Sequence, residues 1–88
     1  MNKTQVGQHE KWVLYLAALG CPTLRIQVSD SESASLLFTR YRDYYGIGAS
    51  DMMPGCGEVC NSSGRVVGHI SYNGRAWDEC GELMHEAV

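Results

Sequence analysis

Residues Gly64–Trp77 read GRVVGHISYNGRAW, which predicts two β-strands joined by a tight turn. Along the first arm two sets of side chains alternate: Val66, Ile70 and Tyr72 against Val67, His69 and Ser71. Such alternation is typical of a strand with one buried face. Asn73 and Gly74 then reverse the chain, because both tolerate the positive φ that a two-residue type I′ turn requires. We therefore expect a β-hairpin with a defined register.

The expected register decides which side chains face the core. A two-residue turn places Ile70 opposite Trp77, both on the inward face. One position further along, His69 and Asp78 are expected opposite each other on the outer face. Together with a four-residue turn before it, this register predicts an inward row of Val59, Val66, Ile70 and Trp77. Because side chains alternate with a period of two, a shift of one residue would exchange the two faces.

Two further strands are expected upstream of this hairpin, at Lys11–Leu19 and Leu24–Val28. The first segment is ambiguous, since its alanines favour a helix whereas Trp12 and Tyr15 favour a strand. The turn residues Gly20–Thr23 and the alternation that follows them favour the strand. We interpret the two segments as an antiparallel pair.

A helix is expected over residues 31–45. Its apolar positions recur with helical spacing and form one stripe, Ala34, Leu37, Phe38, Tyr41 and Tyr45. Ser29, followed three residues later by Glu32, has the spacing of a capping box, and Gly46 suits a left-handed C-terminal cap. The glycines and the proline of Ile47–Gly57 predict an irregular loop. This segment lacks the residue order of a phosphate-binding motif, so no phosphate site is expected there.

With a short strand at Glu58–Cys60, the expected order of elements is ββαβββ. One helix packed on one face of an antiparallel sheet of about five strands is the simplest layered arrangement, an α+β fold. A chain of 88 residues is expected to form a single domain, residues 1–88. The polar ends, residues 1–10 and 81–88, are expected to be loosely ordered.

The charge and hydropathy of the chain bear on its class. The formal net charge is −3, and a general duplex-DNA binder normally carries a basic face. The longest apolar run, Trp12–Leu19, falls far short of the ~20 residues needed to cross a bilayer. It also lacks the charged prelude and cleavage site of a signal peptide, so we expect a cytoplasmic protein without membrane contact.

Three short motifs carry a resemblance to known proteins: Gly48–Asp51 (GASD), Gly64–Val67 (GRVV), and Ile70–Arg75 followed by Trp77 (ISYNGR-x-W). They resemble a group of small uncharacterised bacterial, plasmid and phage proteins, in which a helix ends in a GASD-like loop that precedes an ISYNGR-x-W hairpin. The resemblance spans roughly residues 24 to 78 and implies a shared fold, with no activity to carry over. A fainter likeness, in topology and size, is to certain small phage anti-CRISPR proteins.

Cysteine and histidine residues raise the question of a metal site. Cys56, Cys60, Cys80 and His85 form an alternative set of four zinc ligands. Their spacing lacks the paired ligands of a zinc knuckle, and all four cysteines lie outside the motifs above. We therefore predict reduced cysteines and no metal or cofactor.

A catalytic role is also not favoured. His69 beside Asp78 would resemble a base with its orienting carboxylate, but no nucleophile in a matching context accompanies them. Ser71 is close in sequence, yet it is expected on a strand without the sharp turn of a nucleophile elbow. The chain is therefore predicted not to be an enzyme.

The leading hypothesis is a small protein-interaction module, an accessory protein of a mobile genetic element that binds a host protein or itself. The expected contact residues are exposed Arg40, Arg42, Tyr44, Arg65 and Arg75, or the loop Ile47–Gly57. A sheet edge is a second route, since it can pair with another copy to give a homodimer. The alternatives are a nucleic-acid-binding protein that uses an arginine and tyrosine surface, and an anti-CRISPR-like inhibitor of a nuclease complex.

Overall fold

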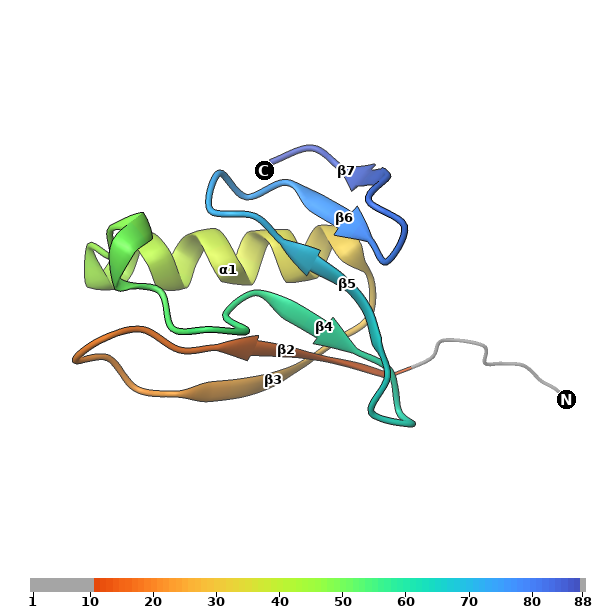
Figure 1. Cartoon of the computed structure of the whole chain (residues 1–88), viewed down its shortest axis with the longest axis horizontal. Coiled ribbons are helices and arrows are strands. Elements are labelled where there is room, and N and C mark those ends of the chain that lie inside the picture. Colours follow the sequence, from red (N-terminus) through yellow and green to blue (C-terminus); the bar gives the residue numbers. More distant parts are fainter. Residues whose placement is uncertain (1–10, 88) are drawn as a thin grey trace, which may run out of the picture.

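The computed structural model describes residues 11–87, in which one helix packs on a six-stranded antiparallel sheet (Figure 1). The elements are β2 (Trp12–Leu16), β3 (Leu24–Val28), α1 (Ser31–Tyr45), the 3₁₀ turn η1 (Ala49–Asp51), β4 (Glu58–Cys60), β5 (Val66–Ile70), β6 (Ala76–Asp78) and β7 (Leu83–His85). The strands lie in the order β3-β2-β4-β5-β6-β7. The α+β prediction is confirmed, with six strands instead of about five. The prediction for residues 1–10 lies outside the described residues.

The sixth strand, β7, corrects the expectation of a loosely ordered end for residues 81–87, and residue 88 lies outside the described residues. It pairs with β6 through Ala76↔His85 and Trp77↔Leu83, with a bulge between the two pairs. Met84 is half-buried and packs against the core cluster. The segment is ordered because its apolar side chain covers the sheet and its backbone extends the ladder.

Three hairpin turns of the C-terminal half share one form. They span Asn61–Arg65, Ser71–Arg75 and Asp78–Glu82, and each has glycine in its fourth position. In each turn the backbone N–H of the first residue donates to the carbonyl of the fifth residue. The N–H of the glycine donates to the carbonyl of the first residue. The three glycines have φ of 84°, 93° and 85°. This is the three-residue loop in which a left-handed glycine forms a bulge, and glycine is required there because other residues are strained at such φ.

The turn at Ser71–Arg75 makes the predicted register wrong by one residue. Its loop holds three residues instead of two, so Ile70 pairs with Ala76 and His69 pairs with Trp77. Ile70 and Ala76 are buried under α1, whereas Trp77 is half-buried on the opposite face with exposed His69. The expected pairing of His69 with Asp78 is therefore also wrong.

The register between β4 and β5 differs from the prediction as well. Val59 pairs with Gly68, not Val66, because the turn has three loop residues instead of four and a bulge next to Cys60 shifts the ladder by one more residue. Val59 is buried while Val66 is 40% exposed, so only Val59 and Ile70 of the expected inward row reach the core. A Cβ on Gly68 would collide with the Trp77 carbonyl, which explains why a residue without a side chain stands there.

The core lies between α1 and the inner face of the sheet. Its members are Leu14, Leu16, Ala18, Val28, Ala34, Phe38, Tyr41, Ile47, Val59, Ile70 and Ala76. Ala34, Phe38 and Tyr41 confirm the predicted helical stripe, although Tyr45 is 40% exposed. Burial of these side chains supplies the main driving force for folding.

The ends of α1 are capped by local hydrogen bonds. Asp30 is the N-cap and accepts from the Ser33 N–H at 2.8 Å, while the Ser33 hydroxyl accepts from the Asp30 N–H. The predicted box of Ser29 and Glu32 is thus displaced by one residue. Gly46 closes the helix in the left-handed conformation, with φ of 62°, as predicted.

Two parts of the sheet, each continuous in sequence, meet at the centre. The β2–β3 hairpin forms one part, and the four strands β4 to β7 form the other. They are joined through β2 and β4, where Val13 pairs with Cys60 and Leu14 with Val59. The chain passes from one part to the other through α1 and the loop that follows it.

Candidate functional site

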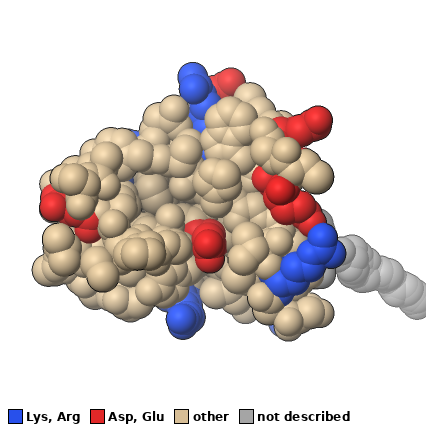
Figure 2. All heavy atoms as spheres, viewed as in Figure 1, with Lys and Arg blue, Asp and Glu red and all other residues tan. Residues whose placement is uncertain are grey.

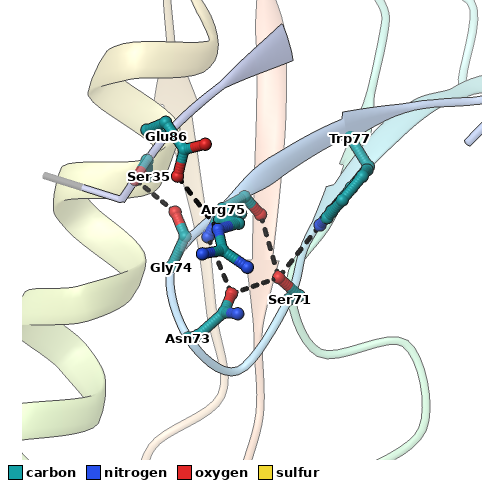
Figure 3. A network of polar contacts seen from close by, with 7 residues as sticks. All are labelled: Ser35, Ser71, Asn73, Gly74, Arg75, Trp77 and Glu86. Atoms are coloured by element: carbon teal, nitrogen blue, oxygen red, sulfur yellow. Dashed lines mark hydrogen bonds and ion pairs between the residues drawn. The ribbon is translucent and has the colours of Figure 1, made fainter. Parts of the chain in front are cut away.

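The ISYNGR-x-W hairpin is held by a polar network inside its own turn (Figure 3). The Ser71 hydroxyl accepts from the Trp77 indole N–H at 3.0 Å and donates to the Asn73 side-chain oxygen at 2.6 Å. That oxygen also accepts from the Arg75 N–H at 3.1 Å. The polar residues of the motif therefore fix the turn and orient the indole, which is a structural role.

The same turn is fastened to α1. The buried Ser35 hydroxyl donates to the Gly74 carbonyl, and a Cβ on Gly74 would lie 2.7 Å from the Thr39 methyl group (Figure 3). The Tyr72 hydroxyl donates to the Ile47 carbonyl at 2.7 Å, which ties the turn to the segment that follows α1. Every polar or small residue of the motif is thus engaged within the chain.

The GASD motif has a structural role too. Gly48 precedes η1, and its carbonyl accepts from the Asp51 N–H at 3.0 Å. The Asp51 carbonyl then accepts from the Leu19 N–H at 2.9 Å, which ties this loop to the β2–β3 turn. Since both motifs are used to build the fold, a functional surface has to be sought among the side chains that the fold leaves exposed.

Three of the predicted contact arginines bind carboxylates of their own chain. Arg65 pairs with Glu79, and Arg75 pairs with Glu86 at 2.9 Å. Arg42 pairs with Asp43 at 2.9 Å. Arg42 is half-buried, not exposed as expected. The exposed pairs of Arg65 and Arg75 each contribute little to stability, and all three pairs lower the charge available to a partner.

Arg42 is also fixed to the hairpin. Its guanidinium donates to the Tyr72 carbonyl at 2.8 Å and lies 5.6 Å from the centre of the Tyr72 ring. The structure does not bring the five predicted residues into one patch. Arg65 is at the β4–β5 turn, Arg75 is at the β5–β6 turn, and the others lie on α1 (Figure 1).

Arg40 and Tyr44 stand one turn apart on the solvent side of α1, where Leu36 is also exposed. Tyr44 is 82% exposed, the highest value among the large apolar side chains that the structure describes. Its ring packs edge-on against Tyr45, with the ring centres 4.8 Å apart. An aromatic ring left in water at a fixed position is a common feature of protein-binding surfaces.

Exposed apolar side chains stand on three segments near this end of the helix, which is on the left in Figure 1. They are Leu19, Tyr44, Tyr45 and Met53, which we call the apolar end. Its segments are fixed to one another, because the Leu19 N–H donates to the Asp51 carbonyl and the Met53 N–H donates to the Ala17 carbonyl. The apolar end is therefore a preorganised surface.

Tyr41 anchors the helix beneath the apolar end. Its hydroxyl donates to the Pro22 carbonyl at 2.8 Å, and its ring contacts Tyr45 edge-on at 5.2 Å. Burial, assisted by nearby Cys21 and Cys56, raises the pKa of the Tyr41 phenol, which therefore stays neutral and donates this bond. The buried ring holds the helix against the β2–β3 turn.

Charges of both signs surround the apolar end, because Arg40 is exposed one helical turn before Tyr44 and Asp43 pairs with Arg42. Asp43 is exposed on the last turns of α1, and Asp51 is half-buried in η1. Figure 2 shows acidic atoms at the left margin of this view, whereas the visible Lys and Arg side chains lie toward its top, bottom and right. Such a surface suits a protein partner better than a phosphate backbone.

A shallow groove of about 450 Å³ lies on the outer face of the sheet. Its lining includes Val13, Tyr15, Arg25, Glu58, Cys60 and the adjoining turns. The Arg25 guanidinium covers the Tyr15 ring at 4.9 Å from its centre. The groove is a mixture of apolar, cationic and acidic groups, and nothing in it converges on a single ligand atom.

The alternative zinc ligands are not brought together. In the described range 11–87, no three His, Cys, Asp or Glu side chains are grouped so that they could hold a metal ion. Cys60 lies in the outer groove and Cys80 is exposed in the last turn. Cys56 instead donates to the Met52 sulfur at 3.3 Å and accepts from the Ala17 N–H.

Burial raises the pKa of the Cys56 thiol, although the Ala17 N–H partly offsets the effect. Because the thiolate is the reactive form, we expect Cys56 to be alkylated more slowly than exposed Cys80 at pH 8, by about tenfold or more. The raised pKa also means that this group stabilises the fold below its unfolded pKa and ceases to do so as the pH rises through the folded value. Iodoacetamide labelling resolved by peptide mass spectrometry measures the rates.

The control for this labelling is the protein in urea, where all four thiols are expected to react at similar rates. Equal rates for Cys56 and Cys80 in the folded protein would contradict the placement of Cys56. Repeating the labelling with a chelator present gives a second readout, and we expect the same rates.

Comparison of the chain with protein-family models, curated proteins and solved structures found no match. Across the part of the chain that the structure describes, the one α-helix is too short and too polar to cross a bilayer. We therefore identify the candidate site, the apolar end, from the structure alone. Sequence reasoning named Tyr44 and the loop that holds Met53, but it missed Leu19 and assigned Tyr45 to the core.

Proposed function

We propose that this chain is a non-enzymatic protein-interaction module whose apolar end binds a partner protein. The observation that supports this most directly is the exposure of Tyr44, 82%, on a surface whose segments are hydrogen-bonded to one another. Leu19, 63% exposed, adds a second large apolar group. A rigid aromatic anchor costs little conformational entropy on binding, which favours affinity.

The chemistry of the apolar end describes its partner. We infer a protein with an apolar pocket for Tyr44 and a polar rim that complements exposed Arg40 and the carboxylate of Asp51. Arg40, one helical turn before Tyr44, is the predicted arginine that remains available at this surface. Following the sequence resemblance, we propose a mobile-element accessory protein that acts on a host protein in the cytoplasm.

A nucleic-acid-binding role has less support. Three of the arginines on which it depends, Arg42, Arg65 and Arg75, pair with carboxylates. Tyr72 is engaged by Arg42 and by the Ile47 carbonyl. Tyr44, which is 82% exposed, is adjacent in sequence to the acidic residue Asp43. We propose the protein-binding role for these reasons.

The proposal is tested by photo-crosslinking in bacterial cells. A benzoyl-phenylalanine residue replaces Tyr44 in one variant and Ser62 in a control variant, because Ser62 is exposed in the β4–β5 turn, away from α1. We expect position 44, and not position 62, to crosslink one defined protein, which mass spectrometry then identifies.

Binding of the identified protein is then measured with purified components. Tyr44→Ala is expected to raise the Kd by about tenfold or more, whereas Arg65→Ala, at the other end of the molecule, is expected to leave it within about twofold. The proposal is overturned if positions 44 and 62 crosslink the same proteins, or if Tyr44→Ala binds as tightly as the original chain.

A further inference from the structure

The two edges of the sheet differ in how well they are protected. β7 has only three residues, carries a bulge in its pairing with β6, and is flanked by Glu82 and Glu86. Short length, bulges and charges are the usual means of preventing edge-to-edge pairing. β3 has five residues that all pair with β2 without a bulge, and it contains neither lysine nor proline.

The backbone hydrogen bonds of β2 show which groups of β3 face outward. The Tyr15 carbonyl accepts from the Gly57 N–H, and the Ala17 carbonyl accepts from the Met53 N–H, so the odd-numbered residues of β2 direct their backbone toward β4. Successive residues of a strand direct these groups to opposite sides. Leu14 therefore bonds to its partner Ile26, and Ile26 is turned toward β2.

By the same alternation, Arg25 and Gln27 direct their N–H and carbonyl groups away from β2. β3 is the first strand in the sheet order, so within residues 11–87 no strand lies on that side. The Arg25 guanidinium does not guard the edge, because it lies over the Tyr15 ring of the outer face. The edge thus offers two donors and two acceptors in a straight, unprotected row.

We propose that β3 pairs with β3 of a second copy, antiparallel, around a two-fold axis at Ile26. In this register Arg25 of one copy lies opposite Gln27 of the other, and their outward backbone groups form four hydrogen bonds across the axis. The two Ile26 residues form the central pair that lacks backbone bonds, so their side chains come close together.

The side chains of this register are self-complementary on both faces. On the helix side, half-buried Leu24 meets buried Val28 of the other copy, and Ile26 meets its equivalent. On the outer side each Arg25 faces the uncharged amide of Gln27, so no like charges are opposed. The pairing covers the apolar side chains of the edge and yields a continuous twelve-stranded sheet from two copies of the six-stranded sheet. It leaves the apolar end to its own partner, so neither proposal depends on the other.

The mass of the full chain in solution, measured by light scattering at about 100 µM, tests the dimer at concentrations well above a micromolar Kd. We expect twice the mass of one chain. Gln27→Pro removes the outward N–H and keeps the bonds to β2, so it is expected to raise the dimer Kd by about tenfold or more. Gln27→Ala keeps the N–H and is the matched control, expected within about threefold.

The register is tested separately with Ile26→Cys in a Cys80→Ser background, under mild oxidation. A disulfide between the two copies of residue 26 is expected, since the central pair places their Cβ atoms within reach of such a bond. Circular dichroism shows whether each variant is folded. A monomeric original chain, a dimer that Gln27→Pro leaves intact, or a dimer of folded Ile26→Cys chains without the 26–26 disulfide would each overturn the proposal.

Discussion

Replacement of Phe38 by alanine is expected to lower the free energy of unfolding by about 3–5 kcal/mol. Phe38 is 1% exposed, and it is the largest of the fully buried side chains. Its ring projects from the middle of α1 to Gly57, at the start of β4. Removal of the ring leaves a cavity between the helix and the sheet, so both burial and packing are lost.

Urea denaturation followed by tryptophan fluorescence measures this loss. A domain of this size has a stability of roughly 5–10 kcal/mol, so Phe38→Ala could leave little folded protein. Phe38→Leu is expected to lose about 1–2 kcal/mol and gives a measurable intermediate. Leu36→Ala is the matched control on the same helix, since Leu36 is 36% exposed, and its expected loss is below about 1 kcal/mol. Similar losses at positions 36 and 38 would contradict the assigned face of α1.

Replacement of Gly57 by alanine is expected to cost more than about 3 kcal/mol. Gly57 has φ of 94°, and a Cβ there would lie 2.5 Å from the Ile70 carbonyl oxygen and 3.3 Å from the Phe38 ring. Its N–H donates to the Tyr15 carbonyl and its carbonyl accepts from the Ile70 N–H, so the backbone cannot move away. Strain in the backbone and a clash with backbone atoms therefore combine at one position.

Gly64→Ala separates the two contributions. Gly64 has φ of 84°, and a Cβ there would meet no atom within 4 Å. Only the backbone strain remains, and the expected cost is about 1–2 kcal/mol. Thermal and urea unfolding of both variants give the comparison. Equal costs for the two substitutions would contradict the close approach of Gly57 to β5.

Much of the fold could be predicted because local patterns determine it. Alternation located Leu24–Val28, and helical spacing with terminal glycine located α1 within its observed bounds. Apart from the bulge at Cys60, one turn pattern explains the difference in register and the unexpected strand β7. The pattern of a polar residue followed three positions later by glycine occurs at Asn61, Ser71 and Asp78, and all three form the same three-residue loop. From the sequence we predict a four-residue turn at the first position and a two-residue turn at the second, and we predict no turn at the third.

The candidate site was harder to predict because it depends on how elements meet. Helical spacing predicts the face of α1 on which Tyr45 lies. It does not show whether the sheet extends far enough to cover that residue. The exposed arginines were expected to be available, yet Arg65 and Arg75 find their carboxylates in the segment around β7. The missed strand therefore also accounts for the missed ion pairs.

The junction between β2 and β4 has a consequence for how the protein folds. On either side of it the strands are linked by short turns, so each part can assemble from neighbours in sequence. The pairing of Leu14 with Val59, in contrast, requires a long intervening stretch of chain to be closed, and that closure costs entropy before it gains contacts. We therefore expect union of the two parts to limit the folding rate, and we expect high φ-values for Leu14→Ala and Val59→Ala in folding kinetics.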